Sequence, residues 1–176
     1  METTGVVRRI DDLGRIVIPK EIRRTLRIKE GSSLEIFVEN DMVALKKYSS
    51  MNSLNDFAEL YVDSISQSLG CMVVITDTDS VVACAGLPKK EYIGSHISEY
   101  LESCLTNRNS VVEKEISELE IIEDNFIKVS YVINTIVSNG DAVGLILVLL
   151  ENKEISELEC KTALIASQFL GKHIEE

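Results

Sequence analysis

The sequence predicts an α+β protein of two domains, a small β-rich one followed by a larger α/β sandwich. In residues 1–50, short β-branched runs and turn residues surround one short helical stretch. After a polar segment at 51–55, helical and strand periodicities alternate through residues 56–176. The charge also changes sign. Residues 1–50 hold ten Lys and Arg against eight Asp and Glu and so carry +2, while residues 51–176 carry −13, which together give the formal net charge of −11. These three ranges are the predicted N-terminal domain, linker and C-terminal domain.

The N-terminal domain reads as β-β-α-β-β. The β-branched runs 5–10 and 14–18 flank a three-residue turn and predict a hairpin. Pro19 ends the second run and suits the first turn of a helix, where its missing N–H costs nothing. Residues 34–39 alternate apolar and polar side chains as a half-buried strand does, and residues 42–48 return as its partner.

A domain of under fifty residues buries too little apolar area to offset its chain entropy. This one has no cysteine to form a disulfide and no cluster of metal ligands. Pairing with a second copy is the usual remedy, so we expect an obligate homodimer through this domain.

The C-terminal domain is expected to run helix, strands, helix, strands, helix around a mostly antiparallel sheet. The predicted elements are helix 54–69, strands 71–77 and 81–85, helix 97–105, strands 127–137 and 142–150, and helix 154–172. Asn139-Gly140 between two apolar strands is a strong hairpin signal, because both residues tolerate positive φ. The closing helix is apolar on more than one face at 163–166, which predicts a second partner, a helix of another subunit.

The hexapeptide EISELE occurs twice, at 115–120 and at 154–159. In the second copy, Ser156 and Glu159 have the spacing of a capping box ahead of an apolar run. The first copy leads into strand and turn residues instead. We therefore interpret the repetition as chance in a Glu-rich chain.

Arginines gather in the N-terminal domain of an otherwise acidic chain. The candidates for a nucleic-acid surface are Arg8, Arg15, Arg23 and Arg24, with Arg9 and Lys20 as weaker ones. Guanidinium groups suit phosphate oxygens and the O6/N7 edge of guanine, and a dimer would present each of them twice. Residues 1–36 contain no aromatic side chain to stack on bases, so double-stranded DNA is a better target than a single strand. The alternative is that these arginines pair with Asp11, Asp12 and Glu21 on a solvated surface.

The stretch DDLGRIVIPKEIRRTLRI, residues 11–28, resembles the AbrB-like swapped-hairpin DNA-binding domain of Gram-positive transition-state regulators. The resemblance extends over residues 4–48. It implies that hairpins from two chains interleave into a β-barrel dimer, and that the DNA-contacting arginines are the four named first above.

The whole chain is similar to developmental regulators of endospore formers that couple this domain to a GAF-like domain. The segment KKEYIGSHISEYLE, residues 89–102, and the closing helix carry that part of the resemblance. It implies a homotetramer assembled through C-terminal helices, and a transcriptional activator and repressor of late, forespore-stage genes. It also leaves room for a small-molecule ligand, which the sequence does not name.

Enzymatic and metal sites are not indicated. The cysteines at 71, 84, 104 and 160 are widely spaced without a CxxC pair, so we expect no metal, no cofactor and reduced, mostly buried thiols. No HExxH, GxSxG, P-loop or GxGxxG motif is present. Lys89 and Lys90 are expected in a solvated loop, and Asp77 and Asp79 in a turn.

The location expected for the chain is the cytoplasm, specifically the forespore, with association to the nucleoid. No apolar run is long enough to span a membrane, and the first residues lack the apolar region of a secretory signal.

Two other functions stay open at this stage. Swapped-hairpin domains also occur in antitoxins, although those usually carry a short disordered tail rather than about 125 residues with clear periodicity. A metabolite sensor in which DNA binding is secondary is the other.

Overall fold

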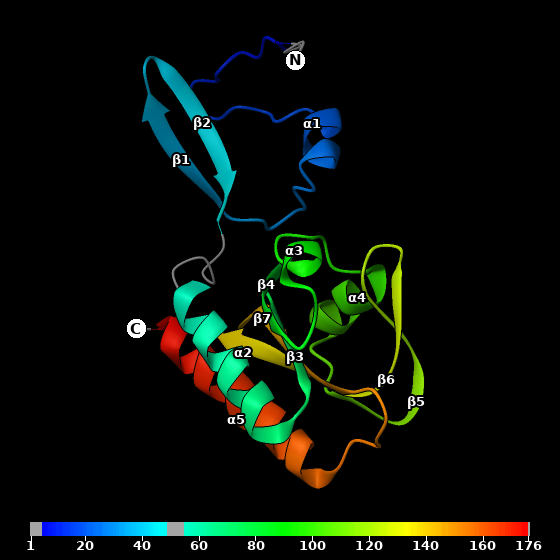
Figure 1. The fold of residues 1–176 in the computed structure, drawn as a ribbon. Coiled ribbons are helices and arrows are strands. Elements are labelled where there is room, and N and C mark those ends of the chain that lie inside the picture. Colours follow the sequence, from blue (N-terminus) through cyan, green and yellow to red (C-terminus); the bar gives the residue numbers. More distant parts are fainter. Residues whose placement is uncertain (1–4, 49–54, 176) are drawn as a thin grey trace. The chain divides into compact units, whose positions relative to one another are not determined.

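The computed structural model describes residues 5–48 and 55–175 (Figure 1). Contacts divide the chain into two compact units, which we call the N-terminal unit (residues 1–48) and the C-terminal unit (residues 49–176). The predicted linker at 51–55 lies, apart from the backbone of Asn55, outside the described residues.

The N-terminal unit contains one short helix and one hairpin. Its elements are α1 (Lys20–Thr25), β1 (Leu34–Glu39) and β2 (Met42–Lys47). The two strands pair antiparallel around Asn40 and Asp41, whose φ angles of 44° and 64° are those a tight two-residue hairpin turn needs. The predicted hairpin of residues 34–48 is thereby confirmed, and so is the helix that follows Pro19.

The predicted strands at 5–10 and 14–18 are wrong for the single chain. Residues 5–11 and 15–19 have no regular secondary structure. The turn between them does form, through hydrogen bonds from the Asp11 amide to the Arg15 carbonyl (3.1 Å) and from the Gly14 amide to the Asp11 carbonyl (3.1 Å). A β-strand needs a neighbour to satisfy its backbone groups, and within the described chain these segments have none.

The C-terminal unit is built on an antiparallel five-stranded sheet of order β4-β3-β7-β6-β5. Its elements are α2 (Asn55–Leu69), β3 (Met72–Thr76), β4 (Val81–Ala85), α3 (Lys89–Tyr92), α4 (Glu99–Asn107), β5 (Val111–Ile122), β6 (Asn125–Ser138), β7 (Asp141–Leu150) and α5 (Glu157–Glu175). Asn139 and Gly140 turn β6 into β7 with φ angles of 50° and 83°, as the Asn-Gly pair predicts.

Helices cover both faces of this sheet, in three layers (Figure 1). α2 and α5 lie side by side on one face, over Val73, Ile75 and their neighbours on β6 and β7. α3 and α4 lie on the other face, where Leu145 and Leu147 belong to a second buried cluster. Alternate residues of β7 serve the two clusters, because successive side chains of a strand point to opposite faces. A sheet buried on both sides explains why this strand is almost continuously apolar.

Two elements of this unit are not predicted from the sequence. β5 is one of the two edge strands of the sheet, and the charged residues along it obscure the alternation that would identify a strand. α3 forms where a loop is expected, and it places Lys89 in a 3.4 Å ion pair with Asp63 of α2. Both partners are substantially exposed, so this ion pair adds little stability.

The two EISELE copies adopt different structures. Residues 115–120 lie in β5, whereas residues 154–159 lead into α5. In the second copy the Glu159 carboxylate accepts a hydrogen bond from the Ser156 amide (2.9 Å), and Ser156 Oγ accepts one from the Leu158 amide (3.2 Å). This reciprocal cap satisfies amide groups that the first turn of a helix leaves without partners.

Candidate nucleic-acid interface

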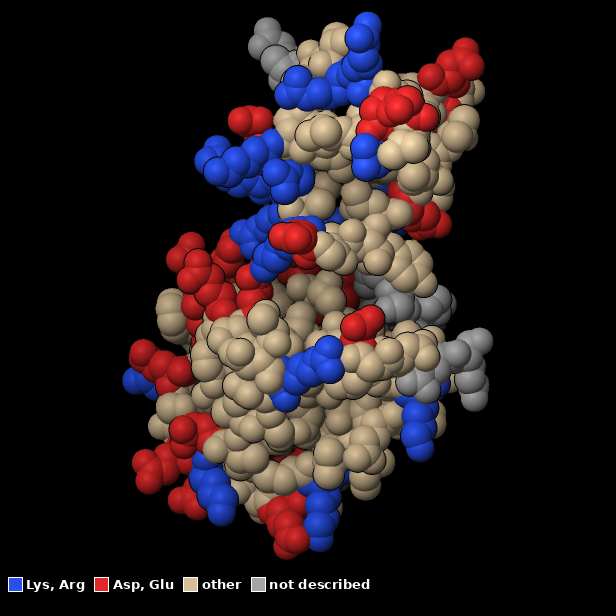
Figure 2. Space-filling view, turned by 180° about the vertical axis from the view of Figure 1, so that it is seen from behind, with Lys and Arg blue, Asp and Glu red and all other residues tan. Residues whose placement is uncertain are grey.

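All six basic residues predicted to bind DNA lie in the N-terminal unit, and all are exposed. They are Arg8, Arg9, Arg15, Lys20, Arg23 and Arg24. Figure 2 shows Lys and Arg side chains gathered over α1 and the segment before it. Asp and Glu are frequent on the surface of the C-terminal unit in the same view.

The helix α1 gives three of these residues a common side. Lys20 is followed three and four positions later by Arg23 and Arg24, a spacing that makes them neighbours on a helix surface. Ile22 and Leu26 fall on the opposite side. The helix is therefore amphipathic. Its basic side is available to a polyanion, and its apolar side is available for packing.

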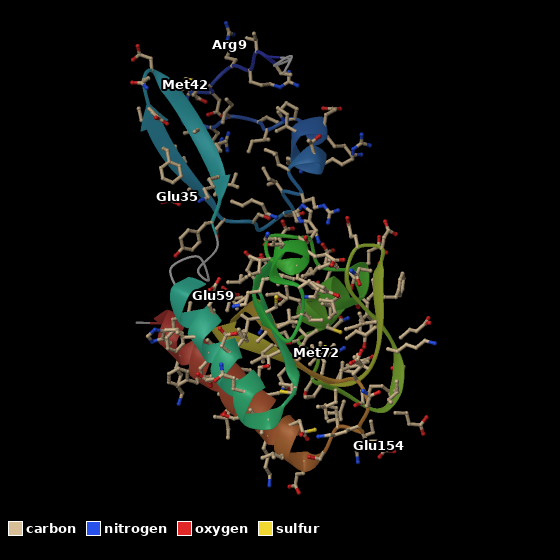
Figure 3. All side chains as sticks on the ribbon, viewed as in Figure 1. Arg9, Glu35, Met42, Glu59, Met72 and Glu154 are labelled. Carbon is tan, nitrogen blue, oxygen red and sulfur yellow. The ribbon has the colours of Figure 1, made fainter. Side chains whose placement is uncertain are left out.

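Arg8 and Arg9 lie before the turn, in a segment without regular secondary structure. The Arg9 side chain extends away from the ribbon in Figure 3. Within the described chain, no carboxylate lies in ion-pair distance of either guanidinium.

Arg15 differs from the others because it forms an ion pair. Its Nε lies 2.7 Å from Asp11 Oδ2 across the turn. The alternative of surface arginines paired with nearby acids therefore holds for this residue. For Arg23, Arg24 and Lys20, the structure places no acidic partner among the described residues.

Asp11 is one of the three acids named as possible partners of the arginines, and the structure shows that it also shapes the turn. Its Oδ1 accepts hydrogen bonds from the Leu13 amide (3.0 Å) and the Arg15 amide (2.7 Å), which closes the turn. These bonds to the backbone and to the Arg15 side chain lower the pKa of the Asp11 carboxyl below its usual range. The signal in the sequence is an Asp three residues before a glycine, and Gly14 indeed has a φ of +77°.

The C-terminal unit offers an open cleft of about 390 Å³ at one end of the sheet. Its lining includes Cys71, Met72 (labelled in Figure 3) and Lys153. Burial, with the Glu159 carboxylate adding to it, raises the pKa of the Cys71 thiol to about 11, so this thiol stays protonated at neutral pH. Burial raises the pKa of the other three cysteine thiols as well. None of the four has the depressed pKa of a nucleophile.

The acidic pair flagged in the sequence belongs to a turn, as expected. Asp77 Oδ1 accepts hydrogen bonds from the Asp79 and Ser80 amides at 2.8 and 2.7 Å. Among the described residues, no three His, Cys, Asp or Glu side chains gather as ligands of one metal ion. Nor does the described part of the chain contain a helix long and apolar enough to cross a membrane.

Comparison with known proteins connects both units to characterised families. The family model "Stage V sporulation protein T C-terminal, transcription factor" matches residues 53–175, and the model "Antidote-toxin recognition MazE, bacterial antitoxin" matches residues 7–52. Stage V sporulation protein T of Bacillus subtilis (strain 168) is 45% identical over 179 aligned residues, covering 100% of both chains. The transition state regulatory protein AbrB of the same organism is 42% identical over 74 residues, covering 42% of this chain and 77% of its own.

The C-terminal unit has the fold of a GAF domain. The GAF domain of the Acinetobacter phosphoenolpyruvate-protein phosphotransferase superposes with a TM-score of 0.56 at 15% identity, over 71% of this chain and 85% of its own. The prediction of an AbrB-like domain followed by a GAF-like one is confirmed. Since one family model covers most of the sequence and a full-length relative shares nearly half of its residues, the chain belongs to the stage V sporulation protein T family of transcription factors.

Proposed function

We propose that the chain is a sporulation transcription factor that binds double-stranded DNA through the basic residues of its N-terminal unit. Arg8, Arg15, Arg23 and Arg24 make the main contacts, and Arg9 and Lys20 add to them. The observation that carries the proposal is the exposure of all six cations on the one unit of an acidic protein that has a positive charge. The protein acts in the forespore cytoplasm, on the nucleoid, as activator at some late genes and repressor at others. It performs no catalysis.

The N-terminal unit binds DNA as a homodimer. None of its described side chains is buried in the single chain, so it has no core of its own. One face of the β1–β2 hairpin carries the cross-strand pairs Ile36–Leu45 and Val38–Val43, which are between 40% and 81% exposed. A second copy can cover this face and supply the neighbouring strands that residues 5–10 and 14–18 lack.

The C-terminal unit joins two such dimers into a homotetramer. α5 buries Ala163, Ala166 and Leu170 against the sheet. On its other side Ile165 is 63% exposed. Phe169, four residues further along, is 46% exposed although its ring packs against Phe57 and Tyr61 of α2. A helix that is apolar on both sides needs a second partner. Holding two DNA-binding dimers together raises the local concentration of the second once the first is bound.

Light scattering with and without a duplex tests this proposal. We expect the mass of four chains alone and a larger complex with DNA. The variant Ile165→Glu should reduce the free protein to two chains, because it places a charge in the helix interface. The matched control is Ile116→Glu on β5, since Ile116 is 50% exposed and should leave four chains intact. A single chain that forms no complex with duplex DNA contradicts the proposal.

An antitoxin is the second candidate, because the MazE model matches residues 7–52. A folded domain of three layers occupies the rest of the chain, where an antitoxin would wrap its toxin with an extended tail. Stoichiometric co-purification with a small basic protein would favour the antitoxin.

A small-molecule ligand for the GAF-like unit remains part of the proposal. Such a ligand would have to shift the DNA affinity, and DNA would then shift the ligand affinity by the same factor.

A further inference from the structure

The two carboxylate oxygens of Asp11 make different interactions in the turn before α1. Oδ1 faces the backbone and accepts from the amides of Leu13 and Arg15, at 3.0 and 2.7 Å. Oδ2 faces a side chain and accepts from Nε of Arg15, at 2.7 Å. One oxygen therefore shapes the turn and the other holds a guanidinium.

The ion pair with Asp11 leaves the two terminal nitrogens of the Arg15 guanidinium available. Only Nε is bonded, and within the described residues the terminal Nη1 and Nη2 groups have no protein partner. The Arg15 side chain is 71% exposed, against 36% for Asp11. Two parallel N–H donors at the tip of a fixed guanidinium match the two oxygens of a phosphate or the O6/N7 edge of guanine.

We propose that Asp11 is a positioning residue for DNA binding, which holds Arg15 by its Nε so that both terminal nitrogens point at the duplex. The inference rests on the proposed function. A free arginine on a surface loses much rotamer freedom when it binds, and an arginine held beforehand loses less. Among the described residues, the other five DNA-binding candidates have no carboxylate that holds them in this way.

Electrostatics alone predicts the opposite role for Asp11. A carboxylate beside a DNA-binding surface repels the phosphates, so its removal should strengthen binding. The pKa of Asp11 is lowered by its hydrogen bonds with Arg15, so the group is ionised at neutral pH and the repulsion is present. The sign of the change in DNA affinity therefore separates positioning from simple charge.

The variant Asp11→Asn removes the interaction with the Arg15 side chain and keeps those with the backbone. Its side-chain oxygen can still accept from the two backbone amides, but its NH₂ group cannot accept from Arg15 Nε. In the full chain we expect Asp11→Asn to weaken binding to a duplex about 3- to 10-fold, the usual scale of coupling between contacting residues. In an Arg15→Ala background the same change should have no effect or should tighten binding.

Asp12→Asn is the matched control, because Asp12 is the adjacent exposed acid. This variant removes the same charge and should leave binding unchanged or slightly tighter. If Asp11→Asn lowers the melting temperature, Arg15→Lys provides a second measurement with the carboxylate intact. Lysine keeps the charge but lacks the fork, so we expect a similar loss of affinity and no further effect from Asp11→Asn.

The outcomes separate the inference from the function on which it rests. If the unmodified chain does not bind a duplex, both are overturned. If Arg15→Ala binds like the unmodified chain, the positioning role fails because Arg15 makes no contact, while duplex binding through the other basic residues stands. If Arg15→Ala weakens binding while Asp11→Asn tightens it in both backgrounds, Asp11 is only a repelling charge. In that case the positioning role fails and the proposed DNA surface stands.

Discussion

Replacing Arg23 and Arg24 together with alanine is expected to weaken duplex binding roughly 10³-fold, as a dimer would then lose four charge-assisted contacts of about 1 kcal/mol each. The fold should be unaffected, because both side chains are exposed on α1 and alanine is at least as good a helix former. The hydrogen bonds that they make in the described helix use backbone atoms, which alanine keeps. A titration of fluorescent duplex and a thermal melt of the same samples would measure both quantities.

Lys114→Ala combined with Lys128→Ala is the control for net charge. These lysines are exposed on β5 and β6 of the C-terminal unit, so the pair removes the same charge from a different surface. We expect a loss of less than about 3-fold, which is the long-range effect of charge alone. Equal losses from the two double variants would mean that the protein attracts DNA only through its overall charge. A large drop in melting temperature for the α1 variant would mean that the arginines are structural.

Val43→Glu is expected to abolish both the N-terminal dimer and DNA binding. Val43 pairs with Val38 on the apolar face of the β1–β2 hairpin and is 70% exposed in the single chain. If that face stayed in water, a glutamate there would change stability very little. If a second copy covers it, an unpaired buried charge costs several kcal/mol, more than a domain of this size can lose.

The control for this variant is the next residue on the same strand. Ala44 is exposed and points to the opposite face, where its cross-strand partner is Phe37. Ala44→Glu adds the same charge and should keep the dimer and most of the DNA affinity. Analytical ultracentrifugation of an Ile165→Glu background, in which only the N-terminal contact holds two chains together, gives the clearest readout. If the protein with both Ile165→Glu and Val43→Glu still sediments as two chains, a second copy does not cover this face of the hairpin.

The elements that could be predicted from sequence are those fixed by local chemistry. Asn139-Gly140 and Asn40-Asp41 both turn strands with positive φ, as their side chains allow. Ser156 and Glu159 cap α5 by the hydrogen bonds that their spacing implies. Gly70 follows the last residue of α2 with a φ of +62°, so the predicted end of that helix is also correct.

The elements that sequence reasoning placed wrongly depend on a neighbour rather than on local chemistry. Residues 5–10 and 14–18 have strand-forming side chains, but a strand forms only where another strand pairs with it. β5 carries charges along an exposed edge, so its pattern resembles a solvated segment. The same holds for the site. Charge and composition indicated the arginines and the acids near them, whereas coordinates were needed to show that Asp11 pairs with Arg15.

The salt dependence of duplex binding reports how many arginine–phosphate contacts the protein makes. If the copies of Arg8, Arg15, Arg23 and Arg24 in one dimer all contact phosphates, a plot of log K against log salt concentration should have a slope of roughly −7. The Arg23→Ala/Arg24→Ala variant should halve that slope, since half of those contacts are removed. A slope near zero for the unmodified protein would mean that duplex binding does not depend on arginine–phosphate contacts, and DNA recognition by these arginines would be wrong.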